Sequence, residues 1–393
     1  MNDVSKRTLK LGAIGLGRAF GLMLPTFAGD RRVSLVAAAD TREAARKRFT
    51  TDFGGKSYAT AEELCADPEV EAVYVATPHQ FHAQHAVLAA RHGKHLLIEK
   101  PLALTLEDCA AIIEAARAAG VHLVVGHSHS FDAPVQRLRA LVQSGAFGVV
   151  RMVTAFNYTD YLYRPRRPEE LDTAQGGGAV YNQAAHQVDV ARFVAGGEVT
   201  SVRAITGAWD RARPTEGAYA ALLTFAGGAF ASLTYNGYGH FDSDEFQGWI
   251  GEMGQKKEPY AAAARPGFAS AAEEAAYKIA RSYGGASYKS ATAPMVAHNH
   301  FGTLLVSCER ADLRAMPNGV MIYEKGVVRL DELAPPSVPR SEVIDELYRA
   351  VVDGVAPLHD GPWAMATMEV LLGMLRSARE GRDISLSHQV GLR

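Results

Sequence analysis

The first 126 residues alternate between short apolar runs and longer segments with helical character. Residues 72–76, 96–98 and 121–125 are short enough to be buried strands, whereas residues 80–92 and 106–119 read as helices. Strands that alternate with helices form a parallel sheet with right-handed crossovers. The pattern therefore predicts an α/β fold that begins with a doubly wound parallel sheet over residues 1–126.

A glycine turn follows the first apolar run of this domain. Residues 8–17 form a short strand that enters Gly15-Leu-Gly17, and residues 18–24 behind it have helical character. Strand, glycine turn and helix together are typical of a dinucleotide site, where glycines let the backbone approach a pyrophosphate and the helix N-terminus stabilises its charge. Phe20 stands where a third glycine is usual, so the fingerprint alone is weak. The predicted cofactor contacts in this stretch are Gly15, Gly17, Arg18, Ala19 and Phe20.

Asp40 ends a second predicted strand, 25 residues after Gly15. That is near the spacing at which a carboxylate accepts the ribose hydroxyls of NAD. Arg42 leaves the choice open, because an arginine there can accommodate the 2′-phosphate of NADP or stack on the adenine. Asp40 can also simply cap the next helix. We expect NAD as the cofactor, with NADP as the alternative.

Polar residues follow two further strands at the carboxyl edge of the sheet, where open α/β sheets bind ligands. Thr77, Pro78 and His79 end the strand 72–76, and we expect them on the nicotinamide side of the cofactor. His79 and His82 reach the cofactor or only cap the following helix, and both interpretations stay open.

Glu99-Lys100-Pro101 follow the strand 96–98. A lysine that faces a partly dry cleft can exchange protons near neutrality because its pKa is lowered there. Lys100 is therefore a candidate for proton transfer, the alternative being an ordinary solvated charge, and Glu99 is a candidate cofactor neighbour.

From about residue 150 onward the sequence pattern changes from alternating strands and helices to mainly extended segments. Residues 150–158, 202–209, 219–225 and 229–235 are extended, partly alternating segments, and two more strands surround 324–326. They predict a second, α+β domain over residues 127–393 with a largely antiparallel, open-faced sheet. Residues 251–297 read as a mobile insertion with a short helix near 271–281, and helices at 341–352 and 363–380 close the chain.

A predicted helix at residues 182–195 carries three polar side chains along one stripe. Asn182 and His186 are four residues apart, and Asp189 follows three residues later. The stripe indicates a site, or alternatively a buried structural histidine whose ring is held by Asp189.

Two other regions of the second domain are candidates for substrate contacts. His129 is expected to line the cleft, and a metal at His127-x-His129 is not expected because no carboxylate or cysteine set accompanies the pair. The loop around residues 158–168 combines tyrosines, including Tyr158, with three arginines. Arginine binds carboxylates in bidentate fashion, so Arg164, Arg166 or Arg167 can hold an anionic ring, bridge subunits or stay solvated.

The composition of the chain restricts the classes of molecule that it is expected to bind. Lys+Arg 41 against Asp+Glu 43 gives a formal net charge of −2, so no overall field draws the protein to nucleic acid or to an acidic membrane. The apolar run near the N-terminus is too short for a signal peptide or a membrane span. Three distant cysteines lack metal-ligand spacing. We expect a cytoplasmic protein with a small-molecule substrate.

Taken together, these pieces resemble the Gfo/Idh/MocA family of nicotinamide oxidoreductases over nearly the whole chain. The matching motifs are Gly15-Leu-Gly17, Ala76-Thr-Pro78 with His82, Glu99-Lys100-Pro101, residues 144–148, Gly176-Gly-Gly178 followed by His186 and Asp189, and residues 377–381. The resemblance implies a Rossmann domain and an open-faced second domain, with Lys100 and His186 as catalytic residues at their interface.

Two departures from the family pattern bear on the substrate. Asn182 stands where the family often has Asp, and His129-Ser130 stand where it often has an arginine pair. The sequence of these motifs is most similar to the branch of carboxy-dihydrodiol dehydrogenases that includes phthalate 4,5-cis-dihydrodiol dehydrogenase. That branch implies oxidation of a carboxylated aromatic cis-dihydrodiol to a catechol. The alternatives are a sugar, inositol or polyol dehydrogenase and a non-catalytic NAD-binding regulator, and the open sheet face favours a homodimer or homotetramer.

Overall fold

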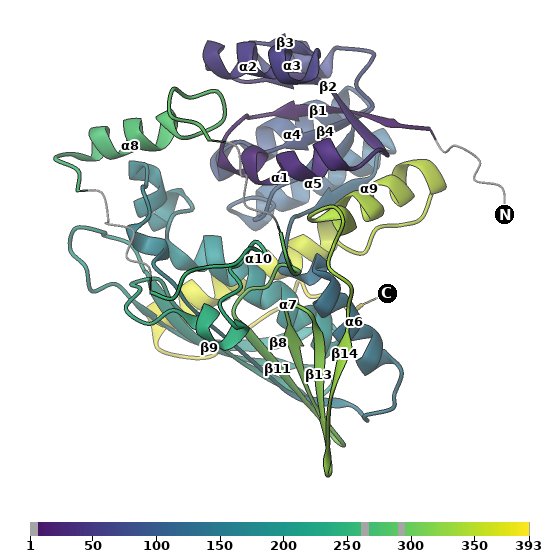
Figure 1. Ribbon diagram of the computed structural model, residues 1–393, viewed down its shortest axis with the longest axis vertical. Coiled ribbons are helices and arrows are strands. Elements are labelled where there is room, and N and C mark those ends of the chain that lie inside the picture. Colours follow the sequence, from purple (N-terminus) through teal and green to yellow (C-terminus); the bar gives the residue numbers. More distant parts are fainter. Residues whose placement is uncertain (1–6, 261–266, 290–294, 393) are drawn as a thin grey trace. The chain divides into compact units, whose positions relative to one another are not determined.

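The computed structural model describes residues 7–260, 267–289 and 295–392 (Figure 1). Contacts group the described residues into two compact units. The first unit is drawn from residues 1–127, 275–292 and 338–365, and the second from residues 128–274, 293–337 and 366–393. Each unit has its own sheet.

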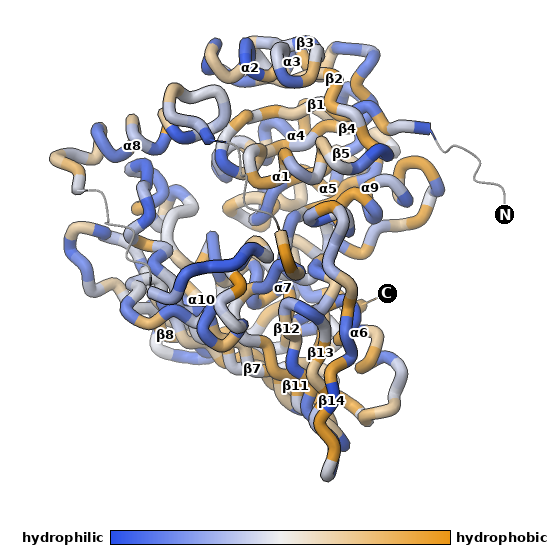
Figure 2. Tube along the Cα trace, in the orientation of Figure 1, coloured by the Kyte–Doolittle hydropathy of each residue, from blue (hydrophilic) through white to orange (hydrophobic). Residues whose placement is uncertain are grey.

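The first unit is built on a parallel sheet, as the sequence predicts; it has six strands, of which the short β3 is not predicted. Its spatial order is β3-β2-β1-β4-β5-β6, and every pairing is parallel. Such a sheet is covered on both faces, which explains why its strands read as continuous apolar runs; the trace through β1 and β4 is mostly orange in Figure 2. The strands are β1 (Leu9–Ile14), β2 (Val33–Ala39), β3 (Lys56–Tyr58), β4 (Ala72–Val75), β5 (His95–Ile98) and β6 (Leu123–Val125).

Helices connect these strands and have clear start and stop signals. The side chain of Thr105 accepts a hydrogen bond from the Asp108 amide at the start of α5, and Gly120 ends α5 in a left-handed conformation. The helices of this unit are α1 (Arg18–Gly29), α2 (Glu43–Phe53), α3 (Ala61–Cys65), α4 (His82–Arg91), α5 (Leu106–Ala119) and α9 (Ser341–Asp353).

The strand order reverses between β1 and β4, which lie side by side in the sheet. Ligands of open α/β sheets bind outside the carboxyl ends of strands at such a point. The loops that follow β1 and β4 meet there, because the Ala76 amide donates to the Ile14 carbonyl at 2.9 Å. This topology places the glycine turn and Thr77-Pro78-His79 at one edge.

The second unit contains a nine-stranded sheet in the order β14-β13-β12-β11-β7-β10-β9-β8-β15. Among its described strands only β7 and β10 pair in parallel, so the predicted largely antiparallel sheet is confirmed. The strands are β7 (Val150–Tyr158), β8 (Val199–Gly207), β9 (Ala218–Phe225), β10 (Phe230–Asn236), β11 (Thr303–Cys308), β12 (Asp312–Met316), β13 (Gly319–Glu324), β14 (Val327–Glu332) and β15 (Ile384–Ser385).

Helices cover one face of this sheet. Helix α6 (Ala133–Gln143) packs on β12 and β13, α7 (Ala185–Ala195) packs on β7 and β10, and α10 (Gly361–Glu380) reaches β8 through Ser377, whose Oγ accepts from the Ala204 amide at 2.9 Å. The opposite face displays Ile205, Leu222 and Phe230, which are 69%, 46% and 42% exposed.

The predicted insertion at 251–297 is described in part. Helix α8 (Ala271–Ala280) matches the short helix predicted near 271–281. Residues 261–266 and 290–294 of the predicted insertion lie outside the described residues. No helix among the described residues is long and apolar enough to cross a membrane.

Candidate active site

The glycine turn in the first unit forms an open cradle at the N-terminus of α1. Gly17 is the N-cap of that helix; among the described residues no side chain caps it, and its first turn carries no acidic residue. A Cβ on Gly17 would meet no described atom within 4 Å, whereas a Cβ on Gly15, at φ +90°, would lie 2.9 Å from the Ala76 carbonyl oxygen. An unobstructed helix N-terminus beside a turn that requires glycine fits the pyrophosphate of a dinucleotide.

Asp40 lies beside this cradle with its carboxylate already engaged. It accepts the Leu16 amide at 2.8 Å, the Arg42 amide at 2.8 Å and two guanidinium bonds from Arg42 at 3.1 Å. These four bonds use the acceptor sites of a carboxylate. Asp40 therefore holds the glycine turn and Arg42 together, and its contact with ribose hydroxyls stays a prediction.

Phe20 points into the interior rather than toward the cradle. Its ring is fully buried and packs against Phe27 and Tyr283, at centroid distances of 6.4 and 5.1 Å. Arg18 and Ala19 lie in the same first turn of α1, exposed and half-buried respectively. The place of a third glycine is thus taken by a core aromatic residue.

His82 joins the two loops that follow β4 and β5. One ring nitrogen lies 2.9 Å from the Pro101 carbonyl oxygen and the other 2.9 Å from the Thr77 carbonyl oxygen. Burial lowers the pKa of His82 to about 4, so the ring is neutral at physiological pH. His82 lies in the first turn of α4, whose N-cap is Phe81, and its contacts join two loops; contact of His82 or of the half-exposed His79 with the cofactor stays a prediction.

Glu99 and Lys100 follow β5 but differ in burial. The Glu99 carboxylate is buried and accepts the Tyr74 hydroxyl at 2.5 Å, and burial raises the pKa of this carboxyl. Lys100 is half-buried at the carboxyl edge of the sheet. The buried Glu99 therefore anchors the loop after β5, and Lys100 is the more exposed residue of the pair at the carboxyl edge of the sheet.

The predicted helix at 182–195 is present, and its first turn is a π-helix. The π-helical turn spans Val180–Ala184 and continues into α7; such turns recur at functional sites. The amide nitrogen of Asn182 donates to the Gly176 and Gly178 carbonyls at 3.1 and 2.9 Å, so Asn182 fixes the glycine run that precedes the helix. His186 lies 7% exposed one turn further on.

His186 belongs to a cluster of three rings within the second unit. Its centroid lies 4.7 Å from that of His129 and 4.8 Å from that of Phe301, and His129 and Phe301 are 4.9 Å apart. Close packing of this kind fixes the orientation of the imidazole.

His129 is held by two carboxylates. Its Nδ1 lies 2.6 Å from Asp132 Oδ2, and its Nε2 lies 3.6 Å from Glu252 Oε1. Burial by itself lowers the pKa of His129, but the charges and hydrogen bonds of the two carboxylates outweigh burial and raise the pKa above its usual value. The two carboxylates therefore favour the protonated form of His129, whose ring lies beside that of His186.

Asp189 is engaged by residues outside its own helix. Its carboxylate accepts the hydroxyls of Ser130 and, at 3.4 Å, of Thr367. One turn below, Arg192 is fully buried and donates to the Gly197 carbonyl, the Thr367 hydroxyl and the Val390 carbonyl. These contacts fix α7 against the C-terminal segment, so Asp189 acts as a support of the helix that carries His186.

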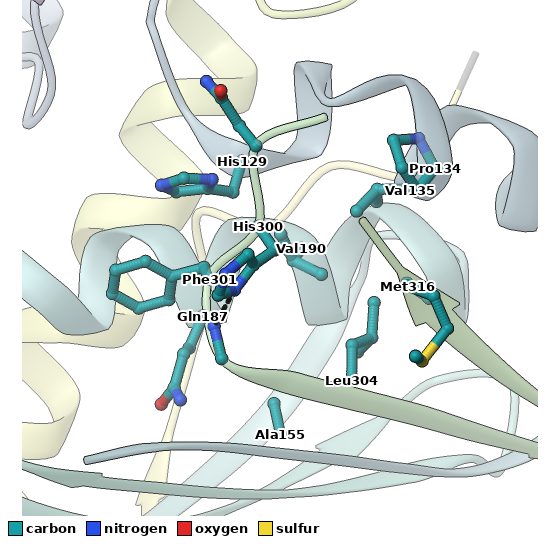
Figure 3. Close-up of a pocket in the computed structure, with 13 residues that line it drawn as sticks. His129, Pro134, Val135, Ala155, Gln187, Val190, His300, Phe301, Leu304 and Met316 are labelled. Carbon is teal, nitrogen blue, oxygen red and sulfur yellow. Dashed lines mark hydrogen bonds between the residues drawn. The ribbon is translucent and has the colours of Figure 1, made fainter. Parts of the chain in front are cut away.

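A pocket opens next to the ring cluster, entirely within the second unit. Figure 3 shows the rings of His129 and Phe301 on one side and Val135, Leu304 and Met316 on the other. The pocket holds about 420 Å³ of empty space, part of it continuous with solvent. Its lining is mostly apolar, and the remaining lining residues are Pro134, Ala155, Gln187, Val190, Asn299, His300, Gly302 and Ala315.

The arginines of the 158–168 loop differ in availability. Arg166 is buried, stacks over the Tyr161 ring at 3.8 Å, and donates to the Tyr161 carbonyl. Arg167 pairs with Glu169 and Glu170. Arg164 pairs with Asp160 at 2.8 Å, and these side chains are 31% and 54% exposed. A solvated pair is worth about 0–1 kcal/mol, so Arg164 is the arginine most easily recruited by an anion, and Tyr158 lies nearby in sequence at the end of β7.

Each unit thus gathers part of the predicted site. The first unit brings together the glycine turn, Asp40, Arg42 and the loops that bear His79 and Lys100. The second unit brings together His129 and His186, and Asn182 holds the run Gly176–Gly178 before the same helix. Sequence reasoning missed Asp132, Gln187, Glu252, Asn299, His300, Phe301 and Tyr283. Two of them lie close in sequence to predicted residues, since Asp132 follows His129 by three positions and Gln187 directly follows His186. Glu252, Phe301 and Tyr283, in contrast, are distant in sequence from the residues that they contact.

A parallel sheet with a glycine cradle at its switch point, followed by a unit that carries a buried histidine cluster, defines a dinucleotide-dependent oxidoreductase scaffold. Comparison with protein families agrees. Residues 9–127 match the oxidoreductase family with an NAD-binding Rossmann fold, and residues 135–249 match the GFO/IDH/MocA C-terminal domain. The chain belongs to the Gfo/Idh/MocA family of NAD-binding oxidoreductases.

Three individual proteins show how similar this chain is to members of known function or structure. The chain is 46% identical over 378 residues to the 1-carboxy-3-chloro-3,4-dihydroxycyclohexa-1,5-diene dehydrogenase of Comamonas testosteroni, covering 94% of this chain and 95% of that protein. A solved structure of a protein from Bordetella bronchiseptica RB50 has 43% sequence identity to this chain and a TM-score of 0.90, and the match covers 96% of this chain and 100% of that one. The myo-inositol 2-dehydrogenase of Thermotoga maritima is 30% identical over 49% of this chain and 57% of that protein.

Proposed function

We propose that this protein oxidises a carboxylated aromatic cis-dihydrodiol to a catechol with NAD as hydride acceptor. The observation that carries the proposal is the mostly apolar pocket lined in part by His129 and Phe301, the two rings that pack against His186. A dihydrodiol is a carbocycle with two hydroxyls on one edge and apolar carbons on the other. A sugar or inositol has a hydroxyl on nearly every carbon and would bury some of them without partners against Val135, Leu304 and Met316, which costs about 1–3 kcal/mol for each. Similarity to the Comamonas testosteroni dehydrogenase supports the same class of substrate.

Lys100 and His186 supply the protein's part of the chemistry. NAD, when bound, accepts a hydride from the carbon that bears the reacting hydroxyl. In this proposal His186, whose ring packs against His129 and Phe301, takes the hydroxyl proton, or Lys100 takes it. Lys100 also stabilises the negative charge that develops on the hydroxyl oxygen. The resulting ketone enolises to the catechol, and aromatisation drives the oxidation forward.

Arg164 is the proposed partner of the ring carboxylate. Its pairing with Asp160 is half-solvated and can be exchanged for a bidentate bond to the substrate. Asn182 has a supporting role, because it holds the Gly176–Gly178 run and an amide does not titrate.

The test is NADH formation by purified protein offered carboxylated cis-dihydrodiols beside sugars, inositols and simple polyols. We expect turnover of the dihydrodiols. Turnover confined to myo-inositol or to sugars would replace the proposal by the polyol alternative, which the Thermotoga maritima relative favours. NADH binding without turnover of any substrate would favour a regulator.

A Lys100→Met variant tests the catalytic assignment. We expect NADH binding to be retained and at least about 99% of turnover to be lost, since one proton-transfer group typically contributes 10²–10⁴-fold. Lys47→Met is the matched control, because Lys47 is 76% exposed and pairs with Glu43 on the surface. Turnover unchanged in Lys100→Met would refute the assignment.

We also propose a homodimer or homotetramer in the cytoplasm. The exposed apolar residues Ile205, Leu222 and Phe230 lie on neighbouring strands β8, β9 and β10. Contiguous apolar patches of this kind are usual at subunit contacts. A cytoplasmic location follows from the need for the cell's pool of NAD.

A further inference from the structure

A segment of the chain outside both matched family regions packs on the dinucleotide unit. The family matches end at residue 127 and at residue 249, whereas Tyr283 and Gly284 belong to the first unit. Tyr283 is 1% exposed. Its hydroxyl donates to Asp52 at 2.8 Å, and its ring packs edge-on against Phe20 at 5.1 Å. The segment is therefore docked on α1 and α2, the two helices that flank the glycine turn and Asp40.

Gly284 shows how closely the segment is docked. Its φ is +73°, and a Cβ at this position would lie 2.5 Å from the Cα of Ala45 in α2. No side chain fits at that distance, and backbone with this φ favours glycine. Any larger residue at position 284 must push the segment away from α2.

The docked segment also holds Arg42. The Tyr283 carbonyl accepts from Arg42 Nη1 at 3.2 Å, the Leu16 carbonyl accepts from Nη2 at 2.7 Å, and the Asp40 carboxylate accepts from Nε and Nη2 at 3.1 Å. The guanidinium is thus fixed on three sides by groups of the protein. Its donors point at Asp40 and at two carbonyls, and the Asp40 charge stays beside it.

We propose that Tyr283 and Gly284 are specificity determinants of the cofactor site, which select NAD over NADP by holding Arg42 on Asp40. This inference rests on the proposed NAD-dependent function. A 2′-phosphate needs free guanidinium donors and is repelled by a carboxylate. While Tyr283 is docked, Arg42 offers few donors and Asp40 keeps its negative charge in place. When the segment is released, Arg42 loses one of its anchors and can turn toward a phosphate.

The experiment compares NADH and NADPH binding to the full-length protein by nicotinamide fluorescence, without turnover. We expect the wild-type protein to bind NADH more tightly than NADPH. In Gly284→Val combined with Tyr283→Ala, the ratio Kd(NADPH)/Kd(NADH) should fall about tenfold, which corresponds to about 1.4 kcal/mol and to the loss of one hydrogen bond to a charged group. Gly267→Val is the matched control, because a Cβ there meets no described atom within 4 Å, and its ratio should equal that of the wild type.

Release of the segment is measured separately, as the rate at which trypsin cleaves after Arg281 or Lys289. Adding Arg42→Gln to the released variant should abolish the gain in NADPH binding, since the gain depends on the freed guanidinium. The proposal is overturned if the wild type prefers NADPH, if cleavage rises and the ratio does not change, or if the gain persists without Arg42. If cleavage does not rise in the double variant, the contacts of Tyr283 and Gly284 do not hold the segment and the proposal also fails. If the proposed function fails but this inference holds, the wild-type protein will bind NADH more tightly than NADPH and yet turn over none of the dihydrodiols.

Discussion

The buried pair of His129 and Asp132 makes a pH-dependent contribution to stability that an Asp132→Asn variant should remove. The side chains are 1% and 2% exposed, so solvent screens their interaction little. Breaking a buried ion pair costs about 3–5 kcal/mol. The oxygen of the introduced amide can still accept a hydrogen bond, and Glu252 still faces the ring, so we expect a loss of about 2–3 kcal/mol at pH 6, in the range of a hydrogen bond to a charged group.

The direction with pH follows from the raised pKa of His129 in the folded protein. A raised pKa means that the folded state binds the proton more tightly than the unfolded state does. The stabilisation is therefore fully present below the unfolded value of about 6.5, and it is lost as the pH rises through the folded value. The difference in unfolding free energy between wild type and variant should therefore be smaller at pH 9 than at pH 6, and above the folded pKa it should approach about 1 kcal/mol or less, the value of a neutral hydrogen bond.

Urea unfolding at pH 6 and pH 9, followed by tryptophan fluorescence, measures both values. Trp209 and Trp249 lie in the same unit as His129 and report on it. The control is Glu114→Gln, whose pair with Arg117 is 61% and 73% exposed and should contribute less than about 1 kcal/mol at either pH. An equal loss at pH 6 and pH 9 would show that the pair gives no pH-dependent stabilisation between these two pH values and would refute the reasoning.

Two further predictions concern the cofactor cradle and the open sheet. Gly15→Ala should abolish NADH binding in a fluorescence titration, because the new Cβ would lie 2.9 Å from the Ala76 carbonyl oxygen in a residue with φ +90°. Gly17→Ala meets no described atom of the protein within 4 Å, so any loss of binding in that variant would come from contact with the cofactor itself. Equal binding by Gly15→Ala and wild type would contradict the cradle. Leu222→Glu combined with Ile205→Glu should convert the assembly to monomers in sedimentation, since two charges would be buried in the proposed interface; an unchanged mass would place the subunit contact elsewhere.

Much of the fold is readable from local signals. Helix α5 has the predicted bounds, 106–119, because Thr105 and Gly120 supply a start and a stop. The strand predicted at 150–158 is β7. In contrast, the sequence pattern does not predict β11 and β12, because Thr303–Cys308 and Asp312–Met316 are short and mix polar with apolar residues. Helix α6 is not predicted either, although Pro134 stands in its first turn.

The candidate site divides in the same way. The glycine turn, Asp40, Lys100 and His186 stand out in the sequence, since each occupies a characteristic place after a strand or on a helix. Their supports do not. Glu252 reaches His129 from a distant part of the chain, and Asp189 accepts from Ser130 across 59 residues rather than acting through a neighbour on its own helix. Contacts of this range depend on tertiary packing, which spacing and periodicity do not report.

The bonds of Arg192 have a consequence for the order in which the protein matures during synthesis. Arg192 donates to the Val390 carbonyl, and α7 is thereby tied to a segment that is translated much later. The first unit is likewise completed late, because the Tyr348 hydroxyl in α9 donates to the Arg7 carbonyl. A contact between segments so far apart in the chain can form only after the later one has been synthesised, so the bond of Arg192 to the Val390 carbonyl is among the last that α7 gains. The helix that bears His186 therefore gains this part of its support only after the later segment has been made.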